Sequence, residues 1–162
     1  MKFAIPRIAF AICTPFFLVS LCSAKIGGPL WTFQTGDAIF SSPTIDSAGN
    51  LYFGSVDGKV YSIDKDGSER WSVQTGDWVE SSAALSPDES TIYIGSWDNK
   101  LYALATVDGT ALWTYETDSL VFSSPAVSSS GEIYFGGSDG FLYALSPAGD
   151  LLWDVFIEGE VD

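Results

Sequence analysis

The sequence contains no histidine, and its only two cysteines, Cys13 and Cys22, lie near the N-terminus. Without histidine, Ser–His–Asp and Cys–His catalytic arrangements are excluded, as are the usual zinc and copper ligand sets. Basic residues are also scarce, with seven against 21 acidic residues and a formal net charge of −14. Such a field repels phosphate backbones and anionic membranes and attracts cations and basic proteins, so we expect no nucleic-acid partner.

The first 24 residues have the order of a secretory signal. Lys2 and Arg7 form a short basic start, residues 8–21 are an apolar run, and small residues follow as far as Ala24. This order predicts a signal peptide over residues 1–24 and export to the periplasm or the medium. The run is short for a bilayer span of about 20 residues, although a retained membrane anchor or a buried helix are the alternatives. Cleavage would remove both cysteines, leave no transmembrane segment, and leave five basic against 21 acidic residues, a charge of −16.

A phrase of about 40 residues recurs along the remainder of the chain. "WTFQTGDAIFSSP" returns as "WSVQTGDWVESSA" and "WTYETDSLVFSSP", and "LYFGSVDGKVYSI" returns as "IYIGSWDNKLYAL" and "IYFGGSDGFLYAL". The two extra residues of the middle copy fall in polar stretches, where loops absorb length. Internal repeats of this period indicate a stacked or radial architecture. The tryptophans that mark the phrase are spaced 40, 42 and 40 residues apart: Trp31, Trp71, Trp113 and Trp153.

Each repeat predicts four short antiparallel strands. β-Branched and aromatic runs alternate with segments rich in Gly, Asp and Asn, which tolerate turn conformations. Asp57-Gly58, Asp98-Asn99 and Asp139-Gly140 each stand between two apolar runs, the strongest short hairpin signal. The strands are apolar on both faces, so each small sheet is expected to be covered on both sides. Four strands in 40-odd residues with two buried faces describe one blade of an all-β propeller.

The repeat also carries most of a known motif. Residues 103–113, "ALATVDGTALW", keep the Ala, Gly and Trp of the tryptophan-docking pattern Ala-x-Asp-x-x-Thr-Gly-x-x-x-Trp, while Ala105 and Asp108 replace its Asp and Thr. Gly67 with Trp71, and Gly149 with Trp153, keep the pattern one residue shorter. The chain thereby resembles the PQQ-like (quinoprotein dehydrogenase-like) β-propellers. The resemblance implies either a plain scaffold, as in outer-membrane-assembly propellers, or an enzyme that oxidises an alcohol or sugar with PQQ and calcium.

The predicted strands do not complete a propeller. We expect blades at about 41–75, 82–117 and 124–157, within a repeat region of residues 25–162, and one surplus strand at residues 30–35. Three blades are fewer than the four to eight that propellers usually have. Two terminal sheets would then have uncovered faces and edges. We therefore expect either a fragment of a longer chain or self-association, such as two chains sharing a six-bladed ring.

The loops before each first strand and the middle hairpins should share one rim. Trp78 and Trp97 stand where the other copies have no tryptophan, so they are predicted to contact a ligand. The recurrent tryptophans Trp31, Trp71, Trp113 and Trp153 are instead predicted to pack blades. Acidic groups beside exposed aromatics could hold a cation, a sugar or a basic peptide, although a turn requirement also explains each Asp-Gly. The predicted rim residues are Asp37, Asp57, Asp77, Asp98 and Asp139, with Phe40 and Phe122 beside the tryptophans.

For function, we favour an exported, non-catalytic scaffold that binds a protein or a small polar ligand at this rim. The alternative is a fragment of a PQQ-dependent dehydrogenase. A quinone on the propeller axis takes ligands from several blades, and three blades cannot enclose it. We therefore predict no catalytic residue, no metal site and no cofactor in this chain, and the resemblance alone raises PQQ with calcium.

Overall fold

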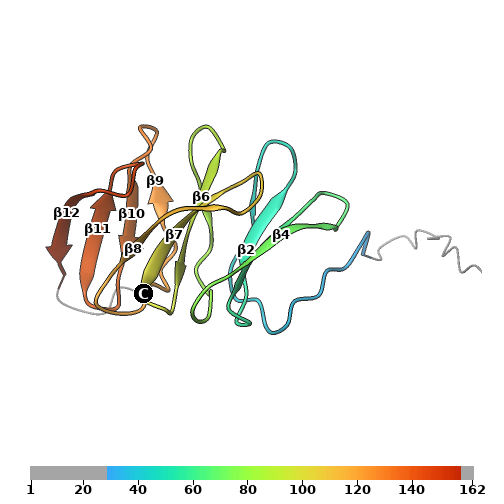
Figure 1. The fold of residues 1–162 in the computed structure, drawn as a ribbon, viewed down its shortest axis with the longest axis horizontal. Helices are drawn as coiled ribbons and strands as arrows, with labels where there is room; N and C mark the ends of the chain where they lie inside the picture. Colours follow the sequence, from blue (N-terminus) through green and yellow to red (C-terminus); the bar gives the residue numbers. More distant parts are fainter. Residues whose placement is uncertain (1–28, 158–162) are drawn as a thin grey trace, which may run out of the picture. The chain divides into compact units, whose positions relative to one another are not determined.

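The computed structural model describes residues 29–157, which form three four-stranded antiparallel sheets (Figure 1). The predicted signal peptide and residues 158–162 lie outside the described part. The all-β class and the three blades of a partial propeller are confirmed. None of the described segments is a helix long and apolar enough to span a membrane.

The three sheets, here called blades 1, 2 and 3, have their strands in chain order from one edge to the other. Blade 1 contains β1 (Thr44–Ile45), β2 (Leu51–Gly54), β3 (Lys59–Ile63) and β4 (Glu69–Gln74). Blade 2 contains β5 (Ala84–Leu85), β6 (Thr91–Ser96), β7 (Lys100–Ala105) and β8 (Ala111–Glu116). Blade 3 contains β9 (Ala126–Val127), β10 (Ile133–Gly136), β11 (Phe141–Leu145) and β12 (Leu151–Phe156).

The middle hairpin of each blade turns through a residue with left-handed backbone. Gly58, Asn99 and Gly140 have φ of 79°, 70° and 87°, a region that Gly enters freely and Asn more readily than most residues. The pairing of the last two strands slips by one residue in every blade, for example between Ser62 and Ile63 in blade 1. The repeats therefore share their irregular features as well as their strands.

The hydrophobic core lies between blades rather than within one sheet. Tyr52 and Trp71 of blade 1 pack against Ile92 and Ile94 of blade 2. A second cluster joins Tyr93 and Leu101 of blade 2 to Phe135 and Leu145 of blade 3. Because a four-stranded sheet alone would leave these apolar side chains in water, each blade depends on its neighbour for burial.

One tryptophan per repeat forms the joint to the following blade. The indole of Trp71 lies over Gly109 in the β7–β8 turn, and its Nε1 donates to the carbonyl of Thr106 at 3.0 Å. Trp113 lies over Gly149 in the same way and donates to the carbonyl of Pro147 at 3.1 Å. A Cβ on Gly109 would stand 2.8 Å from the Trp71 ring, so the joint requires glycine.

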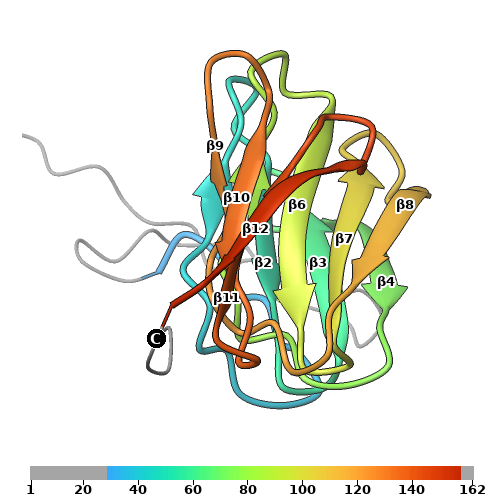
Figure 2. The same cartoon turned by 90° about the vertical axis from the view of Figure 1, so that its left-hand side faces the viewer.

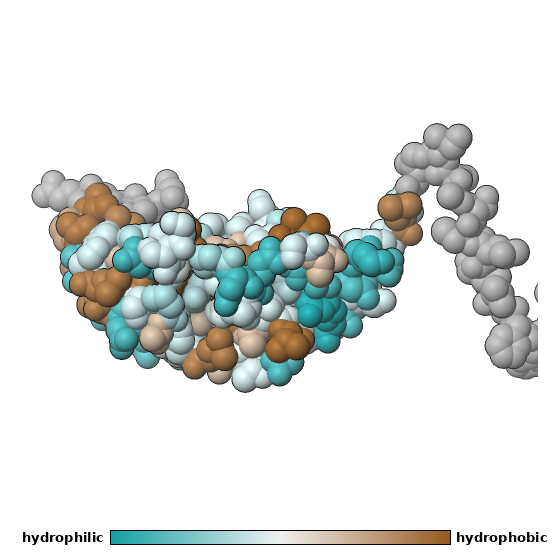
Figure 3. Space-filling model, turned by 90° about the horizontal axis from the view of Figure 1, so that it is seen from above, coloured by the Kyte–Doolittle hydropathy of each residue, from teal (hydrophilic) through white to brown (hydrophobic). Residues whose placement is uncertain are grey.

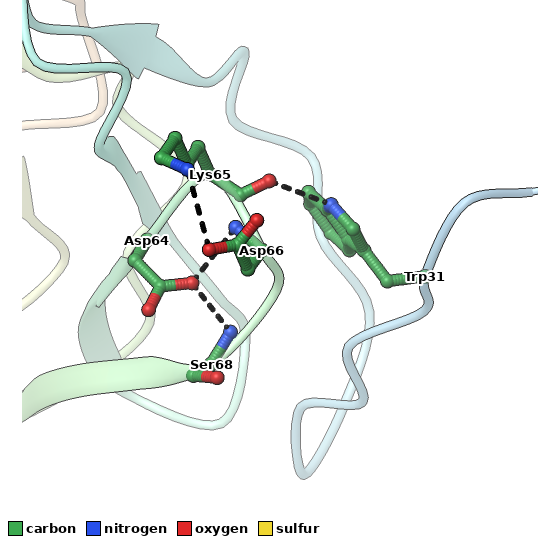
Figure 4. A network of polar contacts seen from close by, with 5 residues as sticks. All are labelled: Trp31, Asp64, Lys65, Asp66 and Ser68. Carbon is green, nitrogen blue, oxygen red and sulfur yellow. Dashed lines mark hydrogen bonds and ion pairs between the residues drawn. The ribbon is translucent and has the colours of Figure 1, made fainter.

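Residues 30–35 were expected to form a surplus strand, and the structure has no strand there. A strand needs a partner for its backbone groups, and this segment has none among the described residues. Its side chains nevertheless pack as those of a last strand do. Trp31 covers Gly67 and donates to the carbonyl of Lys65 at 3.0 Å, in the β3–β4 turn that Asp64 also ties (Figure 4). Phe33 meets the rings of Phe53 and Tyr61 edge-on.

Blade 3 has one face that no described segment covers. Figure 2 shows β9 to β12 in front, with the other blades behind them. Trp153 contacts the ring of Tyr134, but no turn of the described residues lies against it. Its surface is 44% exposed, against 8% for Trp71. Hydrophobic residues accordingly appear at this end of the surface in Figure 3. The exposed apolar side chains of β12 and the residue after it are Leu151, Leu152, Trp153, Val155, Phe156 and Ile157.

Candidate functional site

The predicted rim is formed by the segment that precedes each first strand and by the middle hairpin of a blade. Backbone hydrogen bonds join them: Val56 N–H to Ala38 O, Trp97 N–H to Trp78 O, and Ser138 N–H to Leu120 O, each 2.9 Å. The structure thus brings Trp78 and Trp97 together. It also shows that Ala38 and Leu120 are the structural counterparts of Trp78.

The hairpin aspartates act as clamps. Asp57 Oδ2 accepts hydrogen bonds from Gly36 N–H at 2.7 Å and from the Tyr61 hydroxyl at 2.6 Å. Asp98 repeats this with Gly76 N–H and Tyr102, and Asp139 with Asp118 N–H and Tyr143. These contacts tie a loop to a hairpin, so the main visible role of the three carboxylates is structural.

The clamp shifts the pKa values of the tyrosine and the carboxylate in opposite directions. Burial and the hydrogen bond to Asp57 raise the pKa of Tyr61 to about 12. Burial also raises the pKa of Asp57, but hydrogen bonds from Tyr61 and from backbone N–H groups outweigh it, and the pKa falls below its ordinary value. Asp57 is therefore a fixed negative charge at neutral pH.

Asp37 and Asp77 accept fewer hydrogen bonds than the hairpin aspartates. Each accepts one hydrogen bond, through Oδ1, from the N–H of the next residue, at 2.7 Å and 2.8 Å. Their Oδ2 atoms have no hydrogen bond within the described part of the chain, and both residues are exposed. Of the predicted acidic residues, these two are the ones with a carboxylate oxygen available to a partner.

Trp78 and Trp97 form the aromatic feature of the rim. Their ring centroids lie 4.8 Å apart at an interplanar angle of 43°. Trp78 is 43% exposed, whereas Trp97 is partly buried. Blade 1 has Ala38 and Val56 at these positions, so the pair is a local addition to the repeat.

Sequence reasoning missed three orphaned polar atoms in the middle hairpins. Trp97 Nε1, Asp98 Oδ1 and Ser138 Oγ are buried and lack a hydrogen-bond partner among residues 29–157. In blades 1 and 3 the corresponding carboxylate oxygen accepts the N–H of Lys59 and of Phe141, both at 3.0 Å. Unpaired buried groups are costly and mark strained or functional places. Two of the three belong to the Trp97 hairpin.

A second missed feature is the ladder made by the repeated Ser-Ser pairs. Ser42 N–H donates to Ser82 Oγ at 2.8 Å, and Ser82 N–H donates to Ser124 Oγ at 3.0 Å. Ser41 and Ser81 turn inward, the former onto the carbonyl of Gly54. The recurrence of "SS" in all three copies was the available signal in the sequence. The ladder links neighbouring blades by hydrogen bonds just before their first strands.

Three hollows of the described part of the chain lack the side chains that a quinone cofactor needs. PQQ carries three carboxylates and calls for cationic side chains, yet three hollows of the described part contain no Lys or Arg in their walls. Within residues 29–157 no group of three or more carboxylate or cysteine side chains is placed to hold a metal ion. The absence of a cofactor stays a prediction.

Comparison with known proteins identifies relatives of this fold. A family model described as "Outer membrane protein assembly factor BamB" matches residues 16–160. No curated protein matches the chain. Among solved structures, BamB from Moraxella catarrhalis superposes with a TM-score of 0.68 at 22% sequence identity. The match covers 78% of this chain but 40% of that one, so the chain spans well under half of the larger propeller protein.

Proposed function

Because the chain belongs to the BamB family of PQQ-like β-propeller repeat proteins, we propose that it is an exported, non-catalytic scaffold. In this proposal a protein partner docks on the rim that carries Trp78 and Trp97. The compartment is the periplasm and the partner a component of outer-membrane assembly, by analogy with the name of the matching family.

The exposed Trp78 ring is the observation that carries the proposal. Tryptophan is enriched among residues that dominate protein interfaces, because one ring buries a large apolar area in a fixed orientation. The Trp97 ring packs against the Trp78 ring, with centroids 4.8 Å apart, which limits the freedom that binding must remove. Blade packing does not explain the pair, since the other two blades assemble without it.

Charge around the ring favours a basic partner surface. Asp37 and Asp77 offer free carboxylate oxygens on this rim, and the clamp residue Asp57 is ionised at neutral pH. The chain as a whole carries 21 acidic residues against seven basic ones. Such a field accelerates the approach of a cationic partner and makes association sensitive to salt. No specific observation supports the alternative of a dehydrogenase fragment.

Site-specific photo-cross-linking in the native host tests the proposal. A photoreactive residue would replace Trp78 in one variant and Val107 in another. Val107 is the matched control because it is apolar and 74% exposed, but lies in the β7–β8 turn on the opposite rim. We expect a discrete adduct from position 78 that position 107 does not give.

The captured partner would then be purified and titrated against the wild-type chain, Trp78→Ala and Val107→Ala. We expect Trp78→Ala to weaken binding about thirtyfold, or roughly 2 kcal/mol, as for an interface hot spot, and Val107→Ala to have little effect. Far-UV circular dichroism would show that both variants fold. The same adduct in equal yield at both positions, or equal affinity of both variants for the captured partner, would refute the rim as the docking surface.

A further inference from the structure

A hollow of about 330 Å³ lies on the opposite rim, between blades 2 and 3. Its walls come from the β5–β6 loop, including Asp88, and from the β9–β10 loop, including Ser130; Tyr93 and Pro147 also line it. The two loops stand side by side at the top of Figure 1. The repeat prediction assigns no role to these residues.

Tyr93 is the unusual member of this wall. It is 97% buried, with 3% of its surface exposed, yet its hydroxyl makes no hydrogen bond with any described residue. The tyrosines at the same repeat position are partnered. Tyr52 donates to Asp46 Oδ2 at 2.9 Å, and Tyr134 donates to Glu132 Oε2 at 2.9 Å. Because Tyr93 lines the hollow, its unpartnered hydroxyl is available to a hydrogen-bond donor that enters it.

Blade 1 shows which group donates a hydrogen bond to the hydroxyl of such a tyrosine. The guanidinium of Arg70 donates from Nη1 to the Tyr52 hydroxyl at 3.0 Å and to Ser62 Oγ at 2.9 Å. Arg70 stands in the strand slip next to Trp71. Blade 2 has the same slip next to Trp113, but Leu112 occupies the position of Arg70.

A second difference opens the space. Between blades 1 and 2, the Glu89 carboxylate reaches across and accepts hydrogen bonds from the N–H and hydroxyl of Ser47, at 3.0 Å and 2.5 Å. Between blades 2 and 3 the position of Glu89 is taken by Gly131, which has no side chain to cross the gap. The hollow therefore arises where the chain's own Arg and Glu are both replaced.

We propose that this hollow binds the guanidinium group of an arginine side chain presented by a protein partner. The guanidinium would donate to the Tyr93 hydroxyl, as Arg70 does to Tyr52, and face the Asp88 carboxylate at the mouth. Guanidinium suits a site that combines an aromatic hydroxyl, a carboxylate and several serine and threonine hydroxyls, because its five N–H donors can serve several such acceptors at once. This site is separate from the Trp78 rim and does not depend on the function proposed for it.

Asp88 is suited to balance the positive charge. Hydrogen bonds from the Ser86 hydroxyl and from Ser90 lower the pKa of Asp88 to about 2. It is therefore ionised throughout the physiological range. The carboxylate is also held in place, with Ser86 Oγ at 2.6 Å and Ser90 N at 3.1 Å from Oδ1.

Nuclear magnetic resonance titration of the folded chain with three short peptides tests the proposal. The probes are acetyl-Gly-Arg-Gly-amide, its Lys counterpart, and its citrulline counterpart, which keeps the shape of Arg without the charge. We expect saturable shifts at the amides of residues 86–93 and 129–131 with the Arg peptide. The Lys and citrulline peptides should bind at least fivefold and tenfold more weakly, respectively.

Two pairs of variants separate this site from general attraction to an acidic protein. Tyr93→Phe should weaken the Arg peptide about tenfold, whereas Tyr52→Phe, at the same repeat position beside Arg70, should not. Leu112→Arg should fill the hollow from within and abolish binding. Leu152→Arg adds the same charge on β12 and should leave binding intact.

Four results would overturn the proposal. Equal binding of the Arg and Lys peptides, or shifts spread over both rims, would overturn the proposal in favour of diffuse electrostatic attraction. Full binding by Tyr93→Phe or by Leu112→Arg would place the guanidinium elsewhere. An Arg peptide that causes no saturable shift would show that the hollow holds only solvent. If Leu112→Arg fails to fold, Tyr93→Phe still decides, because it removes one hydroxyl and retains the ring.

Discussion

Replacing Gly109 by alanine should weaken the joint between blades 1 and 2. The loss of folding stability should exceed the cost of placing alanine at a left-handed φ. Gly109 has φ of 77°, and a Cβ there would stand 2.8 Å from Trp71 Cε3 and 2.9 Å from Val73 Cγ2. The new methyl group must therefore push the Trp71 indole, which is 8% exposed and hydrogen-bonded to Thr106, out of its place.

The magnitude follows from two contributions. A non-glycine residue in the left-handed region costs about 1–2 kcal/mol, and overpacking a buried ring costs typically about 1–3 kcal/mol. Gly109→Ala should therefore destabilise by roughly 2–5 kcal/mol in total. Gly49→Ala is the matched control. Its φ is 89°, but its Cβ would meet only Lys65, at 3.4 Å, so about 1–2 kcal/mol is expected there.

Urea unfolding followed by tryptophan fluorescence and by far-UV circular dichroism would measure both variants. We expect Gly109→Ala to lose about 1–3 kcal/mol more than Gly49→Ala. In a Trp71→Leu background the excess should shrink, because the ring that the methyl group meets is gone. If the two glycine variants unfold at the same urea concentration, the docking of Trp71 on this turn is not what requires glycine, and the reasoning fails.

Three further predictions concern single side chains. Trp71→Leu should destabilise by about 2–3 kcal/mol and Trp153→Leu by about half as much in urea unfolding, because their exposed fractions are 8% and 44%. Glu89→Gly should be nearly neutral in the same assay, because it relieves a left-handed φ of 57° while losing both Ser47 hydrogen bonds. Ser47→Ala loses only the hydrogen bond of the hydroxyl, keeps the strained φ of Glu89, and should destabilise by about 1 kcal/mol. Asp88 has a folded pKa lowered to about 2 from 3.8, so its stabilisation is present above pH 4 and lost as the pH falls to 2; thermal melts across this range should show Asp88→Asn with a shallower acid dependence than the wild-type chain.

Periodicity made the fold predictable from the sequence. A position that recurs every 40-odd residues answers a need that every blade has, and Trp71 and Trp113 accordingly take the same place against the next blade. The hairpin residues Gly58 and Gly140 were predictable for a local reason, since their backbone φ is positive in any such turn. The three antiparallel sheets follow from these two signals together.

Departures from the repeat were only partly predictable. The mismatch of Trp78 and Trp97 with the other copies was visible in the sequence. The sequence could not show that their ring centroids lie 4.8 Å apart. Residues 31–35 copy the pattern of a last strand, and pattern alone cannot show that a pairing strand is missing. The isolation of Tyr93 was invisible for another reason. Its counterparts take partners from different repeat positions, Asp46 in one blade and Glu132 in another.

The tryptophan joint has a direction, since the rings of Trp71 and Trp113 each lie over a turn of the following blade. The tryptophan and the glycine turn that receives it therefore lie one repeat apart along the gene. Duplicating or deleting a whole repeat leaves a ring facing a glycine turn on both sides of the change. A family built on this joint can alter its number of blades by recombination without first evolving a new contact.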